Sequence, residues 1–250
     1  MKIIHQIWLQ GKDKIPDKFK KNIKKNITIN FDWEYKLWDS KSITELIKFD
    51  KNINNTYHKL KYMHQKIDFA KYIILYIYGG IYIDMDAYTI KNLNILIQNY
   101  NNYDLIVSKL NCNILENYIH CSRKYCINNG VIYAKPKCSI LLKMIQYIIT
   151  NYKCSNNTNK ISCIEQTTGP KKFTDIIMDN LNENVKILEP EYLEPCIFNN
   201  CNITDNTYVV HEHNGSWYPN WLKQIFIIYL NNKIICYVVF IFVIYFFILS

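Results

Sequence analysis

The chain has 250 residues, of which 49% are hydrophobic, and a formal net charge of +9. This length and composition exclude a disordered chain and suit one domain with a sizeable core. The sequence contains one arginine, Arg123, so paired hydrogen bonds to guanine or phosphate are not expected, and no nucleic-acid partner is predicted. We interpret the lysines between Lys12 and Lys25 as a solvated helix face, although such a run could attract anionic lipid or nucleic acid.

Apolar runs alternate with amphipathic stretches along the chain, which predicts an α/β fold with a mostly parallel sheet. The expected strands are residues 2–9, 34–38, 81–83, 103–108, 131–134, 185–188 and 208–210. The expected helices are residues 15–26, 43–49, 60–78 and 139–150. Asp39-Ser40 is placed to cap the second of these helices. Ligands of such sheets bind beyond the carboxyl ends of the strands, so residues that follow a strand are the candidates for a site.

The helix expected over residues 60–78 carries one apolar stripe. Its apolar residues are spaced three and four apart, and Gly79 is well placed to end it. Asp68, Lys71 and Tyr72 share a face of this helix. On spacing alone, the preferred interpretation is a solvated Asp-Lys pair beside a core tyrosine.

Two aspartates, Asp84 and Asp86, end the strand expected directly after Gly79-Gly80. In an extended chain residues i and i+2 point to the same side, so the two carboxylates would repel each other. A divalent cation relieves that repulsion, because hard cations prefer oxygen ligands, and such a cation can bridge to a diphosphate. The pattern therefore favours an enzyme that uses a nucleotide-activated donor. A surface turn with two solvated aspartates is the plainer alternative, since a D-x-D occurs by chance in many chains.

The nine cysteines are odd in number and scattered in spacing, which argues against a simple disulfide framework and against a zinc site. We expect mostly reduced thiols. Cys154–Cys163 or Cys196–Cys201 could form a bridge in an oxidising compartment.

Every residue from Ile234 to Leu249 is apolar, aromatic or cysteine. A helix that is apolar on all sides at the end of a chain more often meets lipid than protein, although a buried core helix is the alternative. We predict a catalytic domain over residues 1–224 and a hydrophobic, single-pass membrane-anchor helix over residues 225–250, with the side of the membrane undecided.

Several motifs now coincide in order along the chain: KIIHQIWLQG, EYKLWD, IDFAKYIILYIYGGIYIDMDA, NNGVIYAKP, TTGP and HEHNGSW. With them the chain resembles the DXD-containing sugar transferases of glycosyltransferase family 32, which include α-mannosyltransferases and the mannosyltransferases of inositol phosphoceramide. The core is also similar to that of the large clostridial glucosylating toxins. The resemblance covers residues 1 to about 220, and its central block is the most specific part.

The resemblance implies a single GT-A-like domain, a nucleotide-sugar donor and a Mn²⁺ or Mg²⁺ ion. It implies that Asp86 binds the metal, that Asp84 contacts the metal and the donor's ribose and sugar, and that His211 is a third metal contact. Glu212 and His213 are competing metal candidates, because each has a suitable donor atom.

The remaining donor contacts are also carried over from the family, position by position. Trp8 would stack on the base, Ser216 and Trp217 would hold the phosphates, and four residues would contact or line the sugar pocket: Asp68, Lys71, Asn129 and Gly130. The family usually has arginine where Lys71 stands, and lysine lacks the planar fork of arginine.

The function implied is a metal-dependent, retaining transfer of a hexose to a glycan or lipid acceptor. Mannose from GDP-mannose is favoured, and UDP-sugars remain open. No residue stands out as a covalent nucleophile, so front-face attack by the acceptor hydroxyl is expected. One alternative is a catalytically inactive, membrane-anchored binding protein. A D-x-D phosphatase is disfavoured, because Tyr88 stands where those enzymes have threonine or valine.

Overall fold

The computed structural model describes residues 2–155, 157–181, 184–197 and 200–213, together with the single positions 221, 224, 228 and 232. Residues 1–213 form one compact unit, and residues 214–250 form a second. All further description concerns the first unit.

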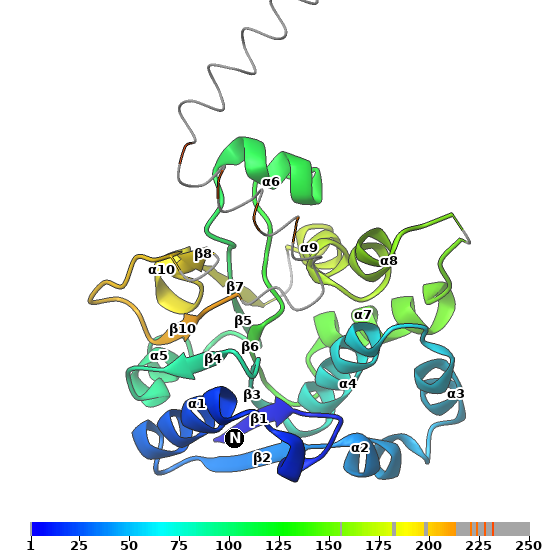
Figure 1. The fold of residues 1–250 in the computed structure, drawn as a ribbon, viewed down its shortest axis with the longest axis horizontal. Coiled ribbons are helices and arrows are strands. Elements are labelled where there is room, and N and C mark those ends of the chain that lie inside the picture. The colour runs from blue at the N-terminus through cyan, green and yellow to red at the C-terminus, as the bar shows by residue number, and fades with distance from the viewer. Residues whose placement is uncertain are drawn as a thin grey trace, which may run out of the picture. The chain divides into compact units, whose positions relative to one another are not determined.

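The centre of this unit is a six-stranded sheet (Figure 1). Its strands, in spatial order, are β2 (Glu34–Trp38), β1 (Ile3–Ile7), β3 (Gly80–Ile83), β6 (Val131–Ala134), β5 (Leu105–Ser108) and β7 (Val185–Leu188). Only β6 runs against its neighbours, since β2, β1 and β3 are mutually parallel and β5 is parallel to β7. The predicted mostly parallel α/β sheet is therefore confirmed, and its six strands lie where the apolar runs predicted them.

The last predicted strand forms outside the central sheet. β10 (Val209–His211) pairs antiparallel with β4 (Ala87–Thr89), which begins four residues after β3 ends. A second small pair joins β8 (Cys196–Ile197) to β9 (Asn200–Cys201).

Eleven helical segments surround the strands in the described part of the chain. They are η1 (Lys12–Lys14), α1 (Asp17–Ile29), α2 (Ser40–Ile47), α3 (Lys51–Lys59), α4 (Met63–Tyr78), α5 (Leu93–Asn99), α6 (Ile114–Cys121), α7 (Ser139–Asn151), α8 (Lys160–Thr167), α9 (Pro170–Met178) and α10 (Pro190–Leu193). The four predicted helices are α1, α2, α4 and α7, and Asp39 caps α2 by accepting the Ser42 N–H at 2.8 Å.

The core has two parts, one on each face of the sheet. On one face α4, α7 and α9 contribute Phe69, Met144 and Phe173, and on the other α5 and α10 contribute Leu93 and Leu193. In Figure 1 these two groups of helices lie on opposite sides of the central strands. The four inner strands β1, β3, β6 and β5 are fully buried between them, whereas the edge strands β2 and β7 are partly exposed.

Gly79 ends α4, as predicted. Its N–H donates to the Leu75 carbonyl oxygen at 2.8 Å, and its φ of 63° lies in the left-handed region that favours glycine. A Cβ at Gly79 would lie 2.5 Å from Cδ of Pro136, so glycine is also required by space. The chain therefore turns directly from α4 into β3.

The expectation of mostly reduced thiols is wrong for this structure. Three disulfides join Cys121 to Cys126, Cys154 to Cys163 and Cys196 to Cys201. Each closes a short loop, and the last two are the bridges that the spacing left open. The cysteine spacing did not predict the three bridges together, because each is local and they do not form one connected framework.

Within the ranges given above, no helix is both long enough and apolar enough to cross a membrane. The predicted anchor over residues 225–250 falls, except for positions 228 and 232, outside the described residues.

Candidate active site

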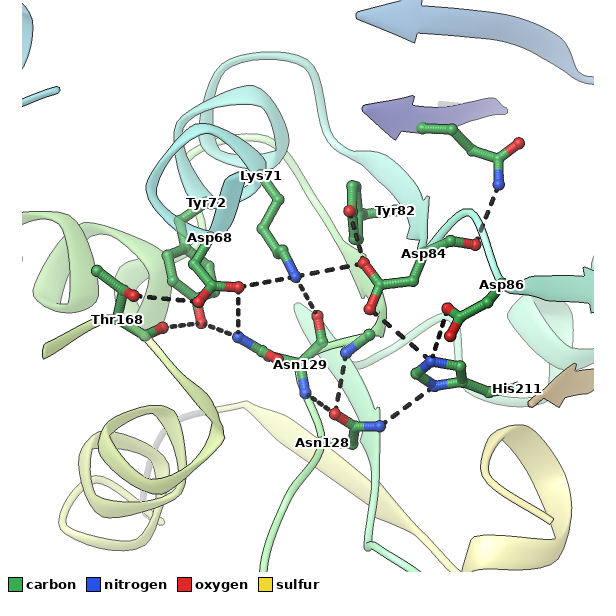
Figure 2. Close-up of polar contacts among 12 residues, drawn as sticks. Asp68, Lys71, Tyr72, Tyr82, Asp84, Asp86, Asn128, Asn129, Thr168 and His211 are labelled. Atoms are coloured by element: carbon green, nitrogen blue, oxygen red, sulfur yellow. Dashed lines mark hydrogen bonds and ion pairs between the residues drawn. The ribbon is translucent and has the colours of Figure 1, made fainter. Parts of the chain in front are cut away.

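The site lies at the carboxyl end of β3, where Asp84 and Asp86 follow the last buried residue of the strand (Figure 2). The turn is held by its backbone: Gln6 Nε2 donates to the Asp84 carbonyl oxygen at 3.1 Å, and the Asp84 N–H donates to the carbonyl oxygen of Gly130 at 2.8 Å. These hydrogen bonds tie the end of β3 to the end of β1 and to the start of β6. They thereby fix the position of the aspartates.

His211 brings an imidazole to these carboxylates. Its Nε2 lies 3.2 Å from Asp86 Oδ1 and 3.8 Å from Asp84 Oδ2, because β10 places His211 opposite Ala87 on β4. One donor atom from each of the three side chains lies within 4.8 Å of the others. Two carboxylate oxygens and an imidazole nitrogen are suitable ligands for a divalent cation such as Mn²⁺ or Mg²⁺.

His211 is buried among acidic groups. Burial disfavours its protonated form, but the charges of Glu194 and Asp86 outweigh that cost and raise the pKa of His211 well above its usual value. Glu194 Oε2 lies 2.9 Å from His211 Nδ1 and 2.8 Å from His213 Nε2. Burial alone would raise the pKa of the Glu194 carboxyl, but the two histidines reverse that effect and lower it.

The three candidate metal ligands of the HEH motif therefore differ in position. His211 contacts both aspartates, whereas His213 contacts Glu194 and stacks on the His211 ring with centroids 4.0 Å apart. Glu212 pairs with Lys18 at 2.7 Å. Sequence reasoning missed Glu194, because a glutamate directly before a proline carries no motif.

Gly130 lies directly against His211 and Asp84. A Cβ at this position would lie 2.3 Å from His211 Cε1 and 2.9 Å from Asp84 Oδ2, so a side chain here would displace the imidazole. The Gly130 N–H donates to Asn128 Oδ1 at 3.3 Å, which holds the glycine in place. The sequence associated Gly130 with the sugar pocket, and the structure places it against the aspartates and His211.

Lys71 lies between two carboxylates. Its Nζ is 3.0 Å from Asp68 Oδ1 and 3.5 Å from Asp84 Oδ1, and it donates to the Asn129 carbonyl oxygen at 3.1 Å. Only 2% of the lysine side chain is exposed, so the interpretation of a solvated Asp-Lys pair is wrong. Burial lowers the pKa of Lys71, but Asp84 and Asp68 outweigh it and the net direction is upward, which keeps the ammonium charged.

A second layer of hydrogen bonds fixes Asp68. Asn129 Nδ2 donates to Asp68 Oδ1 at 3.1 Å and to the Tyr72 hydroxyl at 2.8 Å. Tyr72 in turn donates to the Thr168 carbonyl oxygen at 2.9 Å, and the Thr168 hydroxyl donates to Asp68 Oδ2 at 3.0 Å. Figure 2 shows this network reaching from α4 to the strand ends. The IDFAKY, NNG and TTGP motifs, far apart in the sequence, thus meet in one buried polar network.

Two asparagines of α1 support the aspartate turn from the opposite side. Asn22 Nδ2 donates to the Met85 carbonyl oxygen at 3.1 Å, and Asn26 Nδ2 donates to that of Ala87 at 3.3 Å. The Thr89 N–H donates to Asn26 Oδ1 at 2.7 Å. These side chains bond the edge of β4 that faces away from β10. Sequence reasoning missed both of them, although their spacing of four places them on one helix face.

All the predicted donor and metal contacts remain predictions, those of Trp8, Ser216 and Trp217 among them. Trp8 is partly exposed, donates from Nε1 to the Lys14 carbonyl oxygen at 3.2 Å and packs edge-on against Phe19, an arrangement that does not test base stacking. Ser216 and Trp217 lie outside the described residues.

Comparison with known proteins matches residues 16–103 to the family described as a glycosyltransferase sugar-binding region containing the DXD motif. An uncharacterized glycosyltransferase of Acanthamoeba polyphaga mimivirus is 33% identical over 247 residues, which cover 95% of this chain and 90% of that protein. Inositol phosphoceramide mannosyltransferase 3 of Schizosaccharomyces pombe is 40% identical over 87 residues, which cover 34% of this chain and 24% of that protein.

Solved structures share the fold at low sequence identity. The UDP-bound glycosyltransferase domain of the YGT toxin superposes with a TM-score of 0.51 at 9% identity and covers 74% of this chain and 79% of that one. Mouse xyloside xylosyltransferase 1 gives a TM-score of 0.51 at 9% identity, with coverage of 85% and 98%. The GT-A-like α/β fold is therefore confirmed. With a 33% identical relative matched over nearly the whole of both sequences, the chain belongs to the DXD-containing glycosyltransferases, the family 32 that its motifs resemble.

Proposed function

We propose that this glycosyltransferase is metal-dependent and retaining, and that it moves a hexose from a nucleotide-sugar donor to a glycan or lipid acceptor. The observation that supports the proposal best is the convergence of Asp84, Asp86 and His211 at the end of β3. Carboxylate and imidazole donors at this spacing suit Mn²⁺ or Mg²⁺, and the polar network around Lys71 lies directly beside them.

In this proposal Asp86, His211 and Asp84 hold the cation. The ion, when bound, stabilises the negative charge that develops on the departing nucleoside diphosphate. Asp84 has a second task, because its Oδ1 accepts from the Tyr82 hydroxyl at 2.7 Å and faces Lys71 at 3.5 Å. Asp84 thus links the cation site to the sugar pocket.

The sugar pocket in this proposal is lined by Asp68, Asn129 and Lys71. Asp68 is held by Lys71, Asn129 and Thr168, so its carboxylate is fixed before any ligand arrives. A fixed carboxylate beside the cation site can accept hydrogen bonds from sugar hydroxyl groups without reorganisation. Trp8, Ser216 and Trp217 are proposed to bind the base and the phosphates.

Mannose is the favoured sugar, with GDP-mannose as donor and UDP-sugars as alternatives. The support is the 40% identity of 87 residues to a protein named as an inositol phosphoceramide mannosyltransferase. That name also favours a lipid among the possible acceptors. A membrane anchor over residues 225–250, following a catalytic domain over residues 1–224, would raise the local concentration of a membrane-bound acceptor.

Retention of anomeric configuration is proposed to proceed by front-face attack of the acceptor hydroxyl. The expectation follows from the family resemblance and from the absence of an evident nucleophile motif in the sequence. Mass spectrometry of the enzyme quenched during turnover tests it, because a covalent glycosyl-enzyme would refute front-face attack.

The function itself is tested with the purified full chain, incubated with Mn²⁺ and a panel of GDP- and UDP-sugars with and without glycan and lipid acceptors. We expect release of nucleoside diphosphate from one donor, lost with EDTA and in Asp86→Asn. Asp17→Asn is the matched control, because the Asp17 side chain is 89% exposed on α1. Equal release by the two variants would refute the assigned role of Asp86. Failure of the folded chain to bind any donor by calorimetry would refute the proposed function.

A further inference from the structure

We infer that Glu194 is a positioning residue that fixes His211 in the ring orientation and tautomer needed to bind the cation. The inference rests on the proposed function, because it concerns how His211 would serve as a ligand. Glu194 belongs to none of the motifs that carry the family resemblance.

The Glu194 carboxylate is buried against the ring of His211. Its side chain is 1% exposed, and Oε2 lies 2.9 Å from His211 Nδ1, on the opposite side of the ring from the nitrogen that faces the aspartates. His211 Nε2, in contrast, lies 3.2 Å from Asp86 Oδ1. The imidazole is therefore held at both nitrogens, by a buried carboxylate on one side and by the DXD carboxylates on the other.

The tautomer follows from the chemistry of the partners. A carboxylate only accepts hydrogen bonds, so the contact with Glu194 requires the proton of a neutral imidazole to be on Nδ1. The lone pair of Nε2 then points toward Asp84 and Asp86, where a cation would bind. Asn128 Nδ2 also approaches Nδ1, at 3.3 Å, but the contact with the charged carboxylate is shorter and stronger.

The fold holds Glu194 and His211 on a common support. Glu194 directly follows α10, and its N–H donates to the Pro190 carbonyl oxygen at 2.7 Å. The Tyr208 N–H, one residue before β10, donates to the Tyr192 carbonyl oxygen of α10 at 2.9 Å. The backbone that carries the carboxylate is thus tied to the strand that carries the imidazole.

His213 adds to this arrangement. Its backbone has a φ of 50°, in the left-handed region that side chains rarely adopt, and its ring stacks on that of His211. Nε2 of His213 lies 2.8 Å from the same oxygen of Glu194. Glu194 Oε1 has no hydrogen-bond partner within the described part of the chain. A buried carboxylate of this kind is costly to keep, which favours a specific task over a purely structural one.

The experiment compares Mn²⁺ binding by the full chain without donor, measured from the electron paramagnetic resonance signal of free Mn²⁺. We expect Glu194→Gln to weaken binding about 10–100-fold, the usual effect of removing a carboxylate partner of a metal-binding histidine. In turnover assays the Mn²⁺ concentration for half-maximal rate should rise, while kcat at saturating Mn²⁺ stays near that of the unmodified chain. Glu194→Asp keeps a carboxylate, which only accepts hydrogen bonds, and should restore part of the affinity.

The matched control is Glu191→Gln on α10, the helix that directly precedes Glu194. Glu191 hydrogen-bonds to Thr204 and Asn206, and its replacement should leave the affinity for Mn²⁺ unchanged. Wild-type affinity in a folded Glu194→Gln variant would overturn the inference and leave the proposed function standing. A full chain that folds and binds no Mn²⁺ would overturn the proposed function itself, and with it the role of Glu194.

Discussion

Replacing Lys71 with methionine removes an ammonium group that Asp68 and Asp84 share. Methionine keeps most of the buried volume but leaves both carboxylates without their cation and the Asn129 carbonyl oxygen without a donor. Breaking a buried ion pair by removing one partner costs about 3–5 kcal/mol. For a chain of this size that loss lowers the melting temperature by roughly 6–20 °C.

The sign of the pH dependence follows from Asp68. Burial raises the pKa of Asp68 in the folded protein, and Lys71 opposes that rise. Without Lys71 the folded-state pKa rises further above the unfolded value, so the ionised carboxylate destabilises the fold at neutral pH. The penalty of Lys71→Met should therefore be largest at high pH and should shrink as the pH falls through the raised pKa.

The assay is thermal unfolding of the full chain at several pH values, with Lys135→Met as the matched control. Lys135 pairs with Asp104 at 3.0 Å, the same distance as Lys71 to Asp68, but these side chains are 38% and 46% exposed. An exposed pair contributes about 0–1 kcal/mol. Equal shifts in melting temperature for the two variants would refute the argument that burial determines the cost.

Three further predictions follow from the same structure. Gly130→Ala should displace His211 and weaken Mn²⁺ binding at least about 10-fold by calorimetry, the scale of losing a ligand's support. Asn26→Leu should cost about 2–4 kcal/mol in urea unfolding, because it leaves two buried backbone groups of β4 unpaired. Burial lowers the pKa of His5 to about 4, and its Nδ1 accepts from Trp38, so protonation is disfavoured. His5 should therefore cost the wild type up to about 3 kcal/mol of stability as the pH falls from 6.5 toward 4, a loss absent in His5→Gln.

Each of these has a contrary outcome. An unchanged affinity for Mn²⁺ in a folded Gly130→Ala variant would show that the imidazole can move without loss. A change below about 0.5 kcal/mol for Asn26→Leu would mean that water replaces the asparagine at the edge of β4. Parallel stability curves for the wild type and His5→Gln between pH 7 and 4 would mean that His5 accepts its proton without cost.

The positions of the six central strands followed from the sequence, most directly where a buried strand is a short apolar run between breaks. β2 occupies residues 34–38 as predicted, and β3 ends directly before Asp84. Strand direction did not follow, because β6 reads as the same kind of apolar run as its parallel neighbours and only the path of the chain reverses it. The predicted place of the aspartates depended on the strand end and Gly79, and both are local features.

The contents of the site were only partly predictable. Asp84 and Asp86 share a motif, but the network around Lys71 depends on burial, which helical spacing cannot report, since a buried and a solvated Asp-Lys pair have the same spacing. Glu194 was harder to predict from the sequence, because its contact with His211 depends on the packing of α10 against β10. Short helices such as α3 and α5 were missed because 9 and 7 residues are too few to show a clear helical period.

The asparagines of α1 show most clearly how composition concealed a structural role. The chain is rich in asparagine, so the number of asparagines alone carries little signal. However, Asn22 and Asn26 of α1 and Asn30, which directly follows it, recur at every fourth position, and all three are buried. An apolar stripe would suit a helix that covers the face of a sheet. α1 instead covers the open edge of β4, whose N–H and C=O groups need partners, and an amide side chain supplies both a donor and an acceptor. The lysines of the same helix include exposed residues such as Lys20 and Lys21, consistent with a solvated face. In a chain with this composition, a row of uncharged polar side chains at helical spacing, on the face opposite the charges, is informative about packing. Such a row indicates that the helix covers backbone groups rather than side chains.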